Sequence, residues 1–224
     1  SVHNNNSLEI DFIDSEDITK KNIKRLKNLQ GIVVPGGFGN RGVEGKILAA
    51  NFARINHIPY FGICLGMQIS VIEFARNILG LKDANSTEFD LKTPFPVISL
   101  VTEWDDYKKG KLKGSLNQMG GTMRLGAQSC TLMKKTLAYS LYKKKIISER
   151  HRHRYEVNNK FVDQFNETDL VFSGYSGNKD LMEMLELKHH PWYLASQFHP
   201  EFTSSPLKGH PLFNSFIKTA YETK

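Results

Sequence analysis

The chain contains few cysteines. Its 224 residues include only two, Cys64 and Cys130, and neither stands in a paired spacing such as Cys-x-x-Cys. A disulfide scaffold or a zinc site needs more thiols at closer spacing, so we expect neither, and no metal site. The same scarcity favours a reducing compartment, the cytoplasm, where a thiol stays free.

The sequence also has no long apolar run. No segment is long enough to span a bilayer, and residues 1–10 are rich in asparagine and lack the apolar stretch and cleavage site of a secretory signal. We therefore expect an unsecreted protein with no membrane partner.

The basic residues do not form one long charged tail. The formal net charge is +7, from 30 Lys and Arg against 23 Asp and Glu spread along the chain. Such a surface suits small anions at least as well as nucleic acid. The basic run at residues 149–158 lacks the stacking aromatics and motif of a nucleic-acid site, so we expect no nucleic-acid partner.

What is present is an alternation of strand-like and helix-like segments. We expect strands at residues 8–13, 31–34 and 59–63, and helices at residues 15–29, 43–56 and 67–79. This order implies right-handed crossovers and a parallel sheet. Further strands are expected in the same sheet at residues 97–101, 146–155, 170–174, 181–187 and 192–198. The sequence thus predicts one α/β domain with three layers: a flavodoxin-like, mostly parallel sheet with helices on both faces and added antiparallel strands.

Two segments depart from this pattern. Residues 105–118 show no apolar periodicity, which predicts a mobile surface loop. The first strand begins only at residue 8, one strand later than a doubly wound sheet leads us to expect. We therefore expect a domain over residues 1–224 that is truncated at its N-terminus.

Cys64 lies in the sequence Gly-Ile-Cys-Leu-Gly, residues 62–66, between an expected strand and an expected helix. Two glycines at this spacing permit the tight turn that exposes a nucleophile. A helix N-terminus and a nearby imidazole stabilise a thiolate, so we expect a lowered pKa for the Cys64 thiol. Attack on a carbonyl forms an oxyanion, for which the N–H of Leu65 and the backbone of residues 35–39 are the expected donors.

His199 and Glu201 follow the expected strand at residues 192–198, at the sheet edge that would also carry Cys64. The histidine can move protons to and from the reacting atoms, and the glutamate can fix its tautomer. Taken singly, Cys64 is more often a small buried hydrophobe and His199 a loop residue. Their joint occurrence at strand ends favours a catalytic pair.

Two phosphate-binding alternatives fit poorly. Residues 37–42 read Gly-x-Gly-x-x-Gly, but no ribose-binding acid ends the next strand. Lys46 does not belong to a phosphate loop, because Ile47 replaces the Ser or Thr that binds magnesium and Asn40 replaces the first glycine.

Three arginines alternate with two histidines at residues 150–154. Strand alternation places Arg150, Arg152 and Arg154 on one face and both histidines on the other. A guanidinium fits a carboxylate with two parallel hydrogen bonds, so we expect one of these arginines to bind a small carboxylate.

Three segments, residues 35–39, 62–68 and 197–201, resemble the signature segments of class I glutamine amidotransferases. Five more resemble the glutaminase domain of the CTP synthase family in particular: residues 41–45, 84–89, 120–126, 150–158 and 209–213. The likeness covers nearly the whole chain from residue 8.

The resemblance implies a reaction and a site. Cys64 attacks the side-chain amide of glutamine, forms a glutamyl thioester and releases ammonia, while His199 transfers protons and Glu201 orients it. Glutamine is held by Gly37, Leu65, Gln68, Glu88 and Arg154, and a lid is formed by Arg41, Gly42, Glu44 and Gly45. From sequence alone, Glu88 is equally well explained as an exposed loop acid and Arg154 as one member of a charged strand.

The resemblance also implies partners. In the family, ammonia passes to a synthetase domain of the same polypeptide, where UTP activated by ATP becomes CTP, a step of pyrimidine biosynthesis that GTP stimulates. This chain has no such domain, so we expect no cofactor here: ATP, Mg and UTP belong to the synthetase domain, and GTP acts as an allosteric activator. The full-length protein is expected to be a homo-oligomer.

Two other functions stay open. The chain could supply ammonia in another biosynthetic amidotransferase, against which residues 120–126 and 150–158 argue. It could also be a non-catalytic regulatory module of the same fold, a reading weakened by the presence of Cys64, His199 and Glu201.

Overall fold

A seven-stranded sheet forms the centre of the computed structural model, which describes residues 2–5, 7–100, 103–106, 110–113, 123–177 and 181–223. The strand order is β1-β2-β12-β11-β10-β7-β8. Their bounds are β1 Ile32–Val34, β2 Tyr60–Ile63, β12 Tyr193–Ser196, β11 Leu181–Leu187, β10 Leu170–Ser176, β7 Arg124–Leu132 and β8 Ile146–His153. Strands β1, β2 and β12 run parallel, whereas the remaining pairs are antiparallel.

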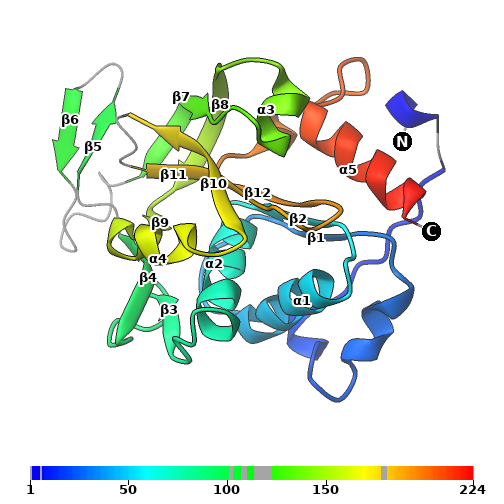
Figure 1. Ribbon diagram of the computed structural model, residues 1–224, viewed down its shortest axis with the longest axis horizontal. Coiled ribbons are helices and arrows are strands. Elements are labelled where there is room, and N and C mark those ends of the chain that lie inside the picture. The colour runs from blue at the N-terminus through cyan, green and yellow to red at the C-terminus, as the bar shows by residue number, and fades with distance from the viewer. Residues whose placement is uncertain are drawn as a thin grey trace.

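Helices cover both faces of this sheet, as Figure 1 shows. Helices α1 (Val43–Ile55) and α2 (Leu65–Asn77) lie on one face, and α3 (Leu137–Tyr142) and α5 (Pro211–Glu222) lie on the other. The short helix α4 (Val162–Asn166) packs against β10. The α/β class with helices on both faces and added antiparallel strands is confirmed, but the described sheet is mixed rather than mostly parallel, since only the pairs β1–β2 and β2–β12 are parallel in it.

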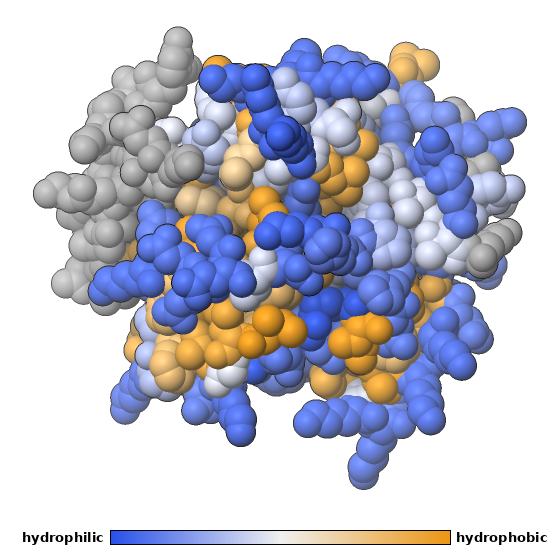
Figure 2. Space-filling view, viewed as in Figure 1, coloured by the Kyte–Doolittle hydropathy of each residue, from blue (hydrophilic) through white to orange (hydrophobic). Residues whose placement is uncertain are grey.

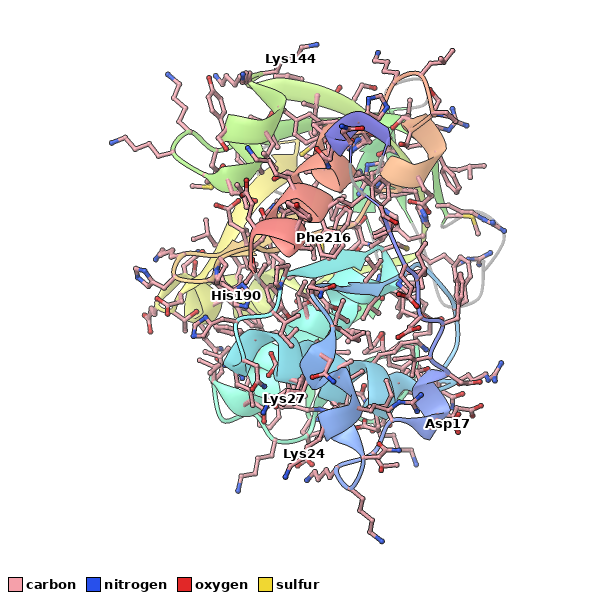
Figure 3. All side chains as sticks on the ribbon, turned by 90° about the vertical axis from the view of Figure 1, so that its right-hand side faces the viewer. Asp17, Lys24, Lys27, Lys144, His190 and Phe216 are labelled. Atoms are coloured by element: carbon pink, nitrogen blue, oxygen red, sulfur yellow. The ribbon has the colours of Figure 1, made fainter. Side chains whose placement is uncertain are left out.

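The large sheet has an apolar core on each face, and the alternation of side chains along its strands explains both. Successive side chains of a strand point to opposite faces, so Tyr60 packs with α1 and α2 while Phe61 packs with Trp192 and Phe216 on the other side. Figure 3 shows Phe216 on the side of α5 that faces the sheet. The face seen in Figure 2 is mainly hydrophilic, with apolar residues in small groups.

Two smaller sheets complete the described strands. One has the order β3-β4-β9 and the other pairs β5 with β6. Their bounds are β3 Ala84–Ser86, β4 Phe95–Leu100, β9 Tyr155–Val157, β5 Glu103–Asp106 and β6 Gly110–Lys113. The 3-10 helices of the described residues are η1 Val2–Asn4, η2 Ser15–Asp17, η3 Ile23–Asn28, η4 Asn159–Phe161 and η5 Pro200–Thr203.

The N-terminal predictions were wrong. Residues 8–13 form no strand, because none of their backbone groups pairs with a strand that the structure describes, and Leu8, Ile10 and Phe12 are exposed. The expected helix at residues 15–29 is replaced by η2 and η3. The side chain of Asn22 bonds the backbone of Thr19 and Asp17, and such local bonds compete with an α-helix.

Later predictions need smaller corrections. The strand expected at residues 146–155 breaks at Arg154, where the chain leaves β8 of the large sheet and enters β9 of a small one. The strand expected at residues 97–101 is β4, which also belongs to that small sheet. The loop expected at residues 105–118 includes parts of β5 and β6, and its residues 107–109 and 114–118 lie outside the described residues. Strand β7 and helix α5 were not predicted.

Within the described residues, no helix is both long enough and apolar enough to cross a membrane.

Candidate active site

The three signature segments meet at one edge of the sheet. Strands β1, β2 and β12 are parallel neighbours, with Val34 opposite Gly62 and Ser196 opposite Ile63. Each segment follows the carboxyl end of one of these strands, so their loops converge at the same edge. The expected location of Cys64 and His199 is confirmed by this topology.

Cys64 occupies a sharp turn between β2 and α2. Its backbone has φ 53° and ψ −102°, a conformation that a residue with a side chain rarely adopts, and its N–H donates to the carbonyl of Ser196 at 2.7 Å. A Cβ atom at Gly62 would stand 2.6 Å from the carbonyl oxygen of Gly66, and one at Gly66 would collide with the carbonyl oxygen of Val34. Close backbone packing therefore requires both glycines of the elbow.

The Cys64 thiol is buried, with 2% of the residue exposed. Burial raises its pKa to about 12, and the Glu201 carboxylate adds to the rise, whereas the N–H of Leu65 opposes it. The expectation of a lowered pKa was wrong for the unliganded site, because loss of water outweighs the helix N-terminus. The sulfur is therefore a neutral thiol at neutral pH.

His199 is held by contacts on several sides. Its Nδ1 lies 2.6 Å from Glu201 Oε1, its ring stacks on Phe202 at 4.7 Å between centroids, and its backbone N–H donates to the carbonyl of Arg150 at 2.8 Å. Because a carboxylate accepts the Nδ1–H, the lone pair lies on Nε2. That Nε2 is buried and has no hydrogen-bond partner in the described part of the chain.

Gly36 lies next to both Cys64 and the imidazole of His199. A Cβ atom at residue 36 would stand 2.8 Å from His199 Cε1 and 3.5 Å from Cys64 Cβ. The missing side chain of this glycine in the β1 loop thus leaves a small space that both Cys64 and His199 border. Gly37 lies beside Leu65, since its Cβ would stand 3.2 Å from Leu65 Cδ2.

The buried side-chain amides of Gln197 and Gln68 form a chain of hydrogen bonds that begins at the sulfur of Cys64. The Gln197 amide nitrogen donates to Cys64 Sγ at 3.7 Å, and its oxygen accepts from Gln68 Nε2 at 3.3 Å. Gln68 Nε2 also donates to the carbonyl oxygen of Tyr155 at 2.9 Å. Sequence reasoning identified Gln68 but missed Gln197 as a site residue, although its place two residues before His199 was a usable signal.

Glu88 and Arg154 approach the same region from different loops. Glu88 Oε1 accepts the N–H of Gly39 at 2.7 Å, and burial raises the pKa of Glu88 while that N–H opposes the rise. Burial and the Glu88 charge raise the pKa of Tyr155, whereas Arg154 lowers it. Both charges therefore act on one phenol. Arg154 forms no hydrogen bond or ion pair with any described residue.

The expected lid segment packs against η2 and α2. Arg41 pairs with Asp14 at 2.7 Å and with Glu16 at 2.8 Å, and Glu44 pairs with Arg76 at 2.9 Å. Cβ atoms at Gly42 and Gly45 would both collide with Ser15. A shallow cavity of about 440 Å³ lies beside this segment, lined by Ser15, Glu16, Ile18, Asn40, Gly42, Val43, Glu44, Gly45, Asn85 and Phe89.

A buried charge cluster lies behind the His199 loop. Arg124 Nη1 donates to Glu156 at 2.6 Å and Arg124 Nη2 to Glu183 at 2.8 Å, while His151 Nδ1 lies 2.9 Å from His153 Nε2. Burial and the charge of Arg124 lower the pKa of both histidines. Alternation in β8 was predicted correctly for these histidines, which point inward while Arg150 and Arg152 are exposed.

In the described ranges, no three His, Cys, Asp or Glu side chains are arranged to hold a metal ion.

Comparisons with known proteins show the family and the fold of the chain. The family described as Glutamine amidotransferase class-I matches residues 2–219. The glutaminase domain of Trypanosoma brucei CTPS, solved with bound acivicin, is 38% identical with a TM-score of 0.89, over 99% of this chain and 83% of that one. A protein described as a GMP synthase component from Thermoplasma acidophilum is 19% identical with a TM-score of 0.56, over 94% of this chain and 78% of that one, a likeness of fold alone.

Proposed function

Because the chain belongs to the class I glutamine amidotransferase family, we propose that it hydrolyses glutamine to glutamate and ammonia with Cys64 as nucleophile. One observation carries the assignment of roles. The hydrogen bond from His199 to Glu201 leaves a buried, unpartnered Nε2 on an imidazole that shares the space around Gly36 with Cys64. A base and a thiol so arranged suit acyl transfer.

The first half-reaction begins from the neutral thiol. His199 Nε2 takes the thiol proton as the sulfur attacks the amide carbon, so no free thiolate has to persist in the buried site. The N–H groups of Leu65 and Gly37 stabilise the oxyanion. His199 then returns the proton to the leaving nitrogen, the carbon–nitrogen bond breaks, and ammonia leaves a glutamyl thioester on Cys64.

The second half-reaction uses the same base. His199 removes a proton from water, the oxygen attacks the thioester carbon, and the carbon–sulfur bond breaks to release glutamate and restore the thiol. Glu201 keeps the proton on Nδ1 and stabilises the imidazolium that forms in each half-reaction.

Charge complementarity supports the mode of glutamine binding. Glu88 suits the ammonium group of glutamine, and Arg154 suits its carboxylate because its guanidinium has no partner among the described residues. Gln68, which bonds the carbonyl of Tyr155 and the side chain of Gln197, holds the substrate near the sulfur.

The ammonia serves the amination of UTP to CTP. The likeness to the CTPS glutaminase domain over 99% of this chain supports this destination. In this proposal, ATP, Mg and UTP bind a synthetase domain of the same cytoplasmic polypeptide, GTP acts as activator, and the full-length protein is a homo-oligomer.

Ammonia release and covalent labelling test the proposal together. The purified chain is incubated with glutamine, and separately with acivicin, the compound bound by the Trypanosoma brucei domain. We expect release of ammonia and glutamate, and an adduct on the peptide that contains Cys64. The variant Cys64→Ala should lose both, whereas Cys130→Ala, which removes a buried thiol outside the site, should retain both. Absence of ammonia, or an adduct elsewhere, overturns the proposal.

A further inference from the structure

Gln197 is a buried amide in contact with the reacting sulfur. None of the residue is exposed, and it follows β12 directly, with its backbone N–H donating to the carbonyl of Glu183 at 2.8 Å. Both ends of its side chain are engaged, at Cys64 and at Gln68. The mechanism above gives this side chain no role.

Its neighbours fix which end of the amide faces the sulfur. The carbonyl oxygen of Tyr155 only accepts hydrogen bonds, so the group of Gln68 that lies 2.9 Å from it is the NH₂. The second N–H of that NH₂ points to Gln197, which must present its oxygen there. The NH₂ of Gln197 is consequently directed at Cys64 Sγ, 3.7 Å away.

We propose that Gln197 is a further catalytic residue of this site, whose amide N–H stabilises the negative charge that develops on Cys64 Sγ. The proposal rests on the function proposed above. A thiol is a weak acceptor and a thiolate a strong one, so this hydrogen bond strengthens as the proton leaves. Gln68 acts through Gln197 as a positioning residue, and because Gln68 also holds glutamine, substrate binding and sulfur activation share one side chain.

The pH dependence of Cys64 alkylation by iodoacetamide tests the contact without any turnover. Only the thiolate reacts, and peptide mass mapping separates Cys64 from Cys130. In Gln197→Met, which keeps the size of the side chain but has no donor, we expect about a tenfold slower reaction at fixed pH, which is equivalent to a rise of about one pH unit in the midpoint of the alkylation profile. The matched control is Ser196→Ala, which removes the Ser196 hydroxyl bond to the Phe198 carbonyl in the same loop. It should leave the profile in place.

A double variant tests the role of Gln68. Gln68→Met should raise the midpoint by less than Gln197→Met does. If Gln68 acts only through Gln197, the double variant should match Gln197→Met alone. If Gln197→Met does not fold, Gln197→Asn replaces it, because its shorter side chain fails to span Gln68 and Cys64 and should raise the midpoint as well.

The outcomes separate this proposal from the proposed function. An unchanged profile in a folded Gln197 variant, or an equal shift in Ser196→Ala, overturns the role of Gln197 even where the chain releases ammonia. If the profile shifts but the chain releases no ammonia, the role of Gln197 at the sulfur stands and the glutaminase function is overturned. When both hold, Gln197→Met lowers kcat for ammonia release about tenfold with little change in KM.

Discussion

Gly36 touches His199 so closely that a Cβ atom at residue 36 would stand 2.8 Å from the Cε1 atom of the imidazole. On another side the imidazole stacks on Phe202 at 4.7 Å, and its Nδ1 is held by Glu201. The ring is therefore in contact on these three sides, and a larger residue at position 36 would push it from its place.

Gly36→Ala should displace the imidazole without unfolding the chain. Proton transfer depends on sub-ångström positioning, so we expect kcat for ammonia release to fall about 10–100-fold. The control is Gly80→Ala, whose Cβ meets nothing within 4 Å but whose φ of +73° strains a side chain. That control should lower the melting temperature and leave kcat unchanged. Equal kcat values for Gly36→Ala and the unsubstituted chain would contradict the close contact as a determinant of activity.

Glu201→Gln should impair the base while keeping its geometry. The amide oxygen still accepts from Nδ1, but the negative charge that stabilises the imidazolium is lost, and an inverted amide would favour the wrong tautomer. We expect kcat to fall about 100-fold or more with KM for glutamine within about threefold, measured by steady-state ammonia release. A mainly raised KM would assign Glu201 to substrate binding instead.

The sequence predicted that Cys64 and His199 lie at one sheet edge because each follows the end of an expected strand. The chain order strand, glycine turn, helix placed Cys64, and the parallel neighbours β1, β2 and β12 brought His199 to it. The contact of Gly36 with His199 and the orientation of Gln197 were not predictable, because they depend on side-chain packing between segments far apart in sequence. The thiol pKa was predicted wrongly for the same reason, since a local motif does not report burial.

The fold was predictable where apolar periodicity was strong. Helix α1 and strands β1, β2 and β11 fall where their patterns place them. The pattern failed at residues 15–29, where the local bonds of Asn22 compete with a helix. It also failed at Arg154, where an unbroken alternation conceals a change of sheet.

Glu156→Gln should alter how stability depends on pH. Burial raises the pKa of Glu156 from 4.5 to about 8, against the opposing charge of Arg124. Between these values the folded chain holds a proton that the unfolded chain has lost, so this stabilising contribution is complete below pH 4.5 and is lost as pH rises through 8. The amide of Gln accepts from Arg124 without titrating.

Denaturant unfolding of both proteins from pH 5 to pH 8 measures this effect. The free energy of unfolding of Glu156→Gln, relative to the unsubstituted chain, should rise by about 1–3 kcal/mol across the range. Glu222→Gln, at a carboxylate with 59% of its side chain exposed, should show no such slope. A flat difference for Glu156→Gln would mean that Glu156 keeps its charge throughout.

Glu88→Gln should weaken recognition of the ammonium group of glutamine. The substitution keeps an oxygen that accepts the N–H of Gly39, so the loop retains its shape while the charge is lost. A hydrogen bond to a charged group contributes about 1.5–3 kcal/mol, which corresponds to a KM increase of about 10–100-fold with kcat nearly unchanged. Asp90→Asn, an exposed carboxylate two residues further along the chain, is the matched control and should leave KM unchanged.

Two further results should follow from the charge of Glu88. Because burial raises its pKa, the carboxylate is neutralised at a higher pH than an ordinary glutamate, so KM should rise on mild acidification in the unsubstituted chain and stay flat in Glu88→Gln. N-acetylglutamine carries no ammonium, so the unsubstituted chain should prefer glutamine strongly and Glu88→Gln only weakly. If both proteins discriminate equally between the two amides, the ammonium is bound elsewhere, and Glu88 serves only to hold the Gly39 loop.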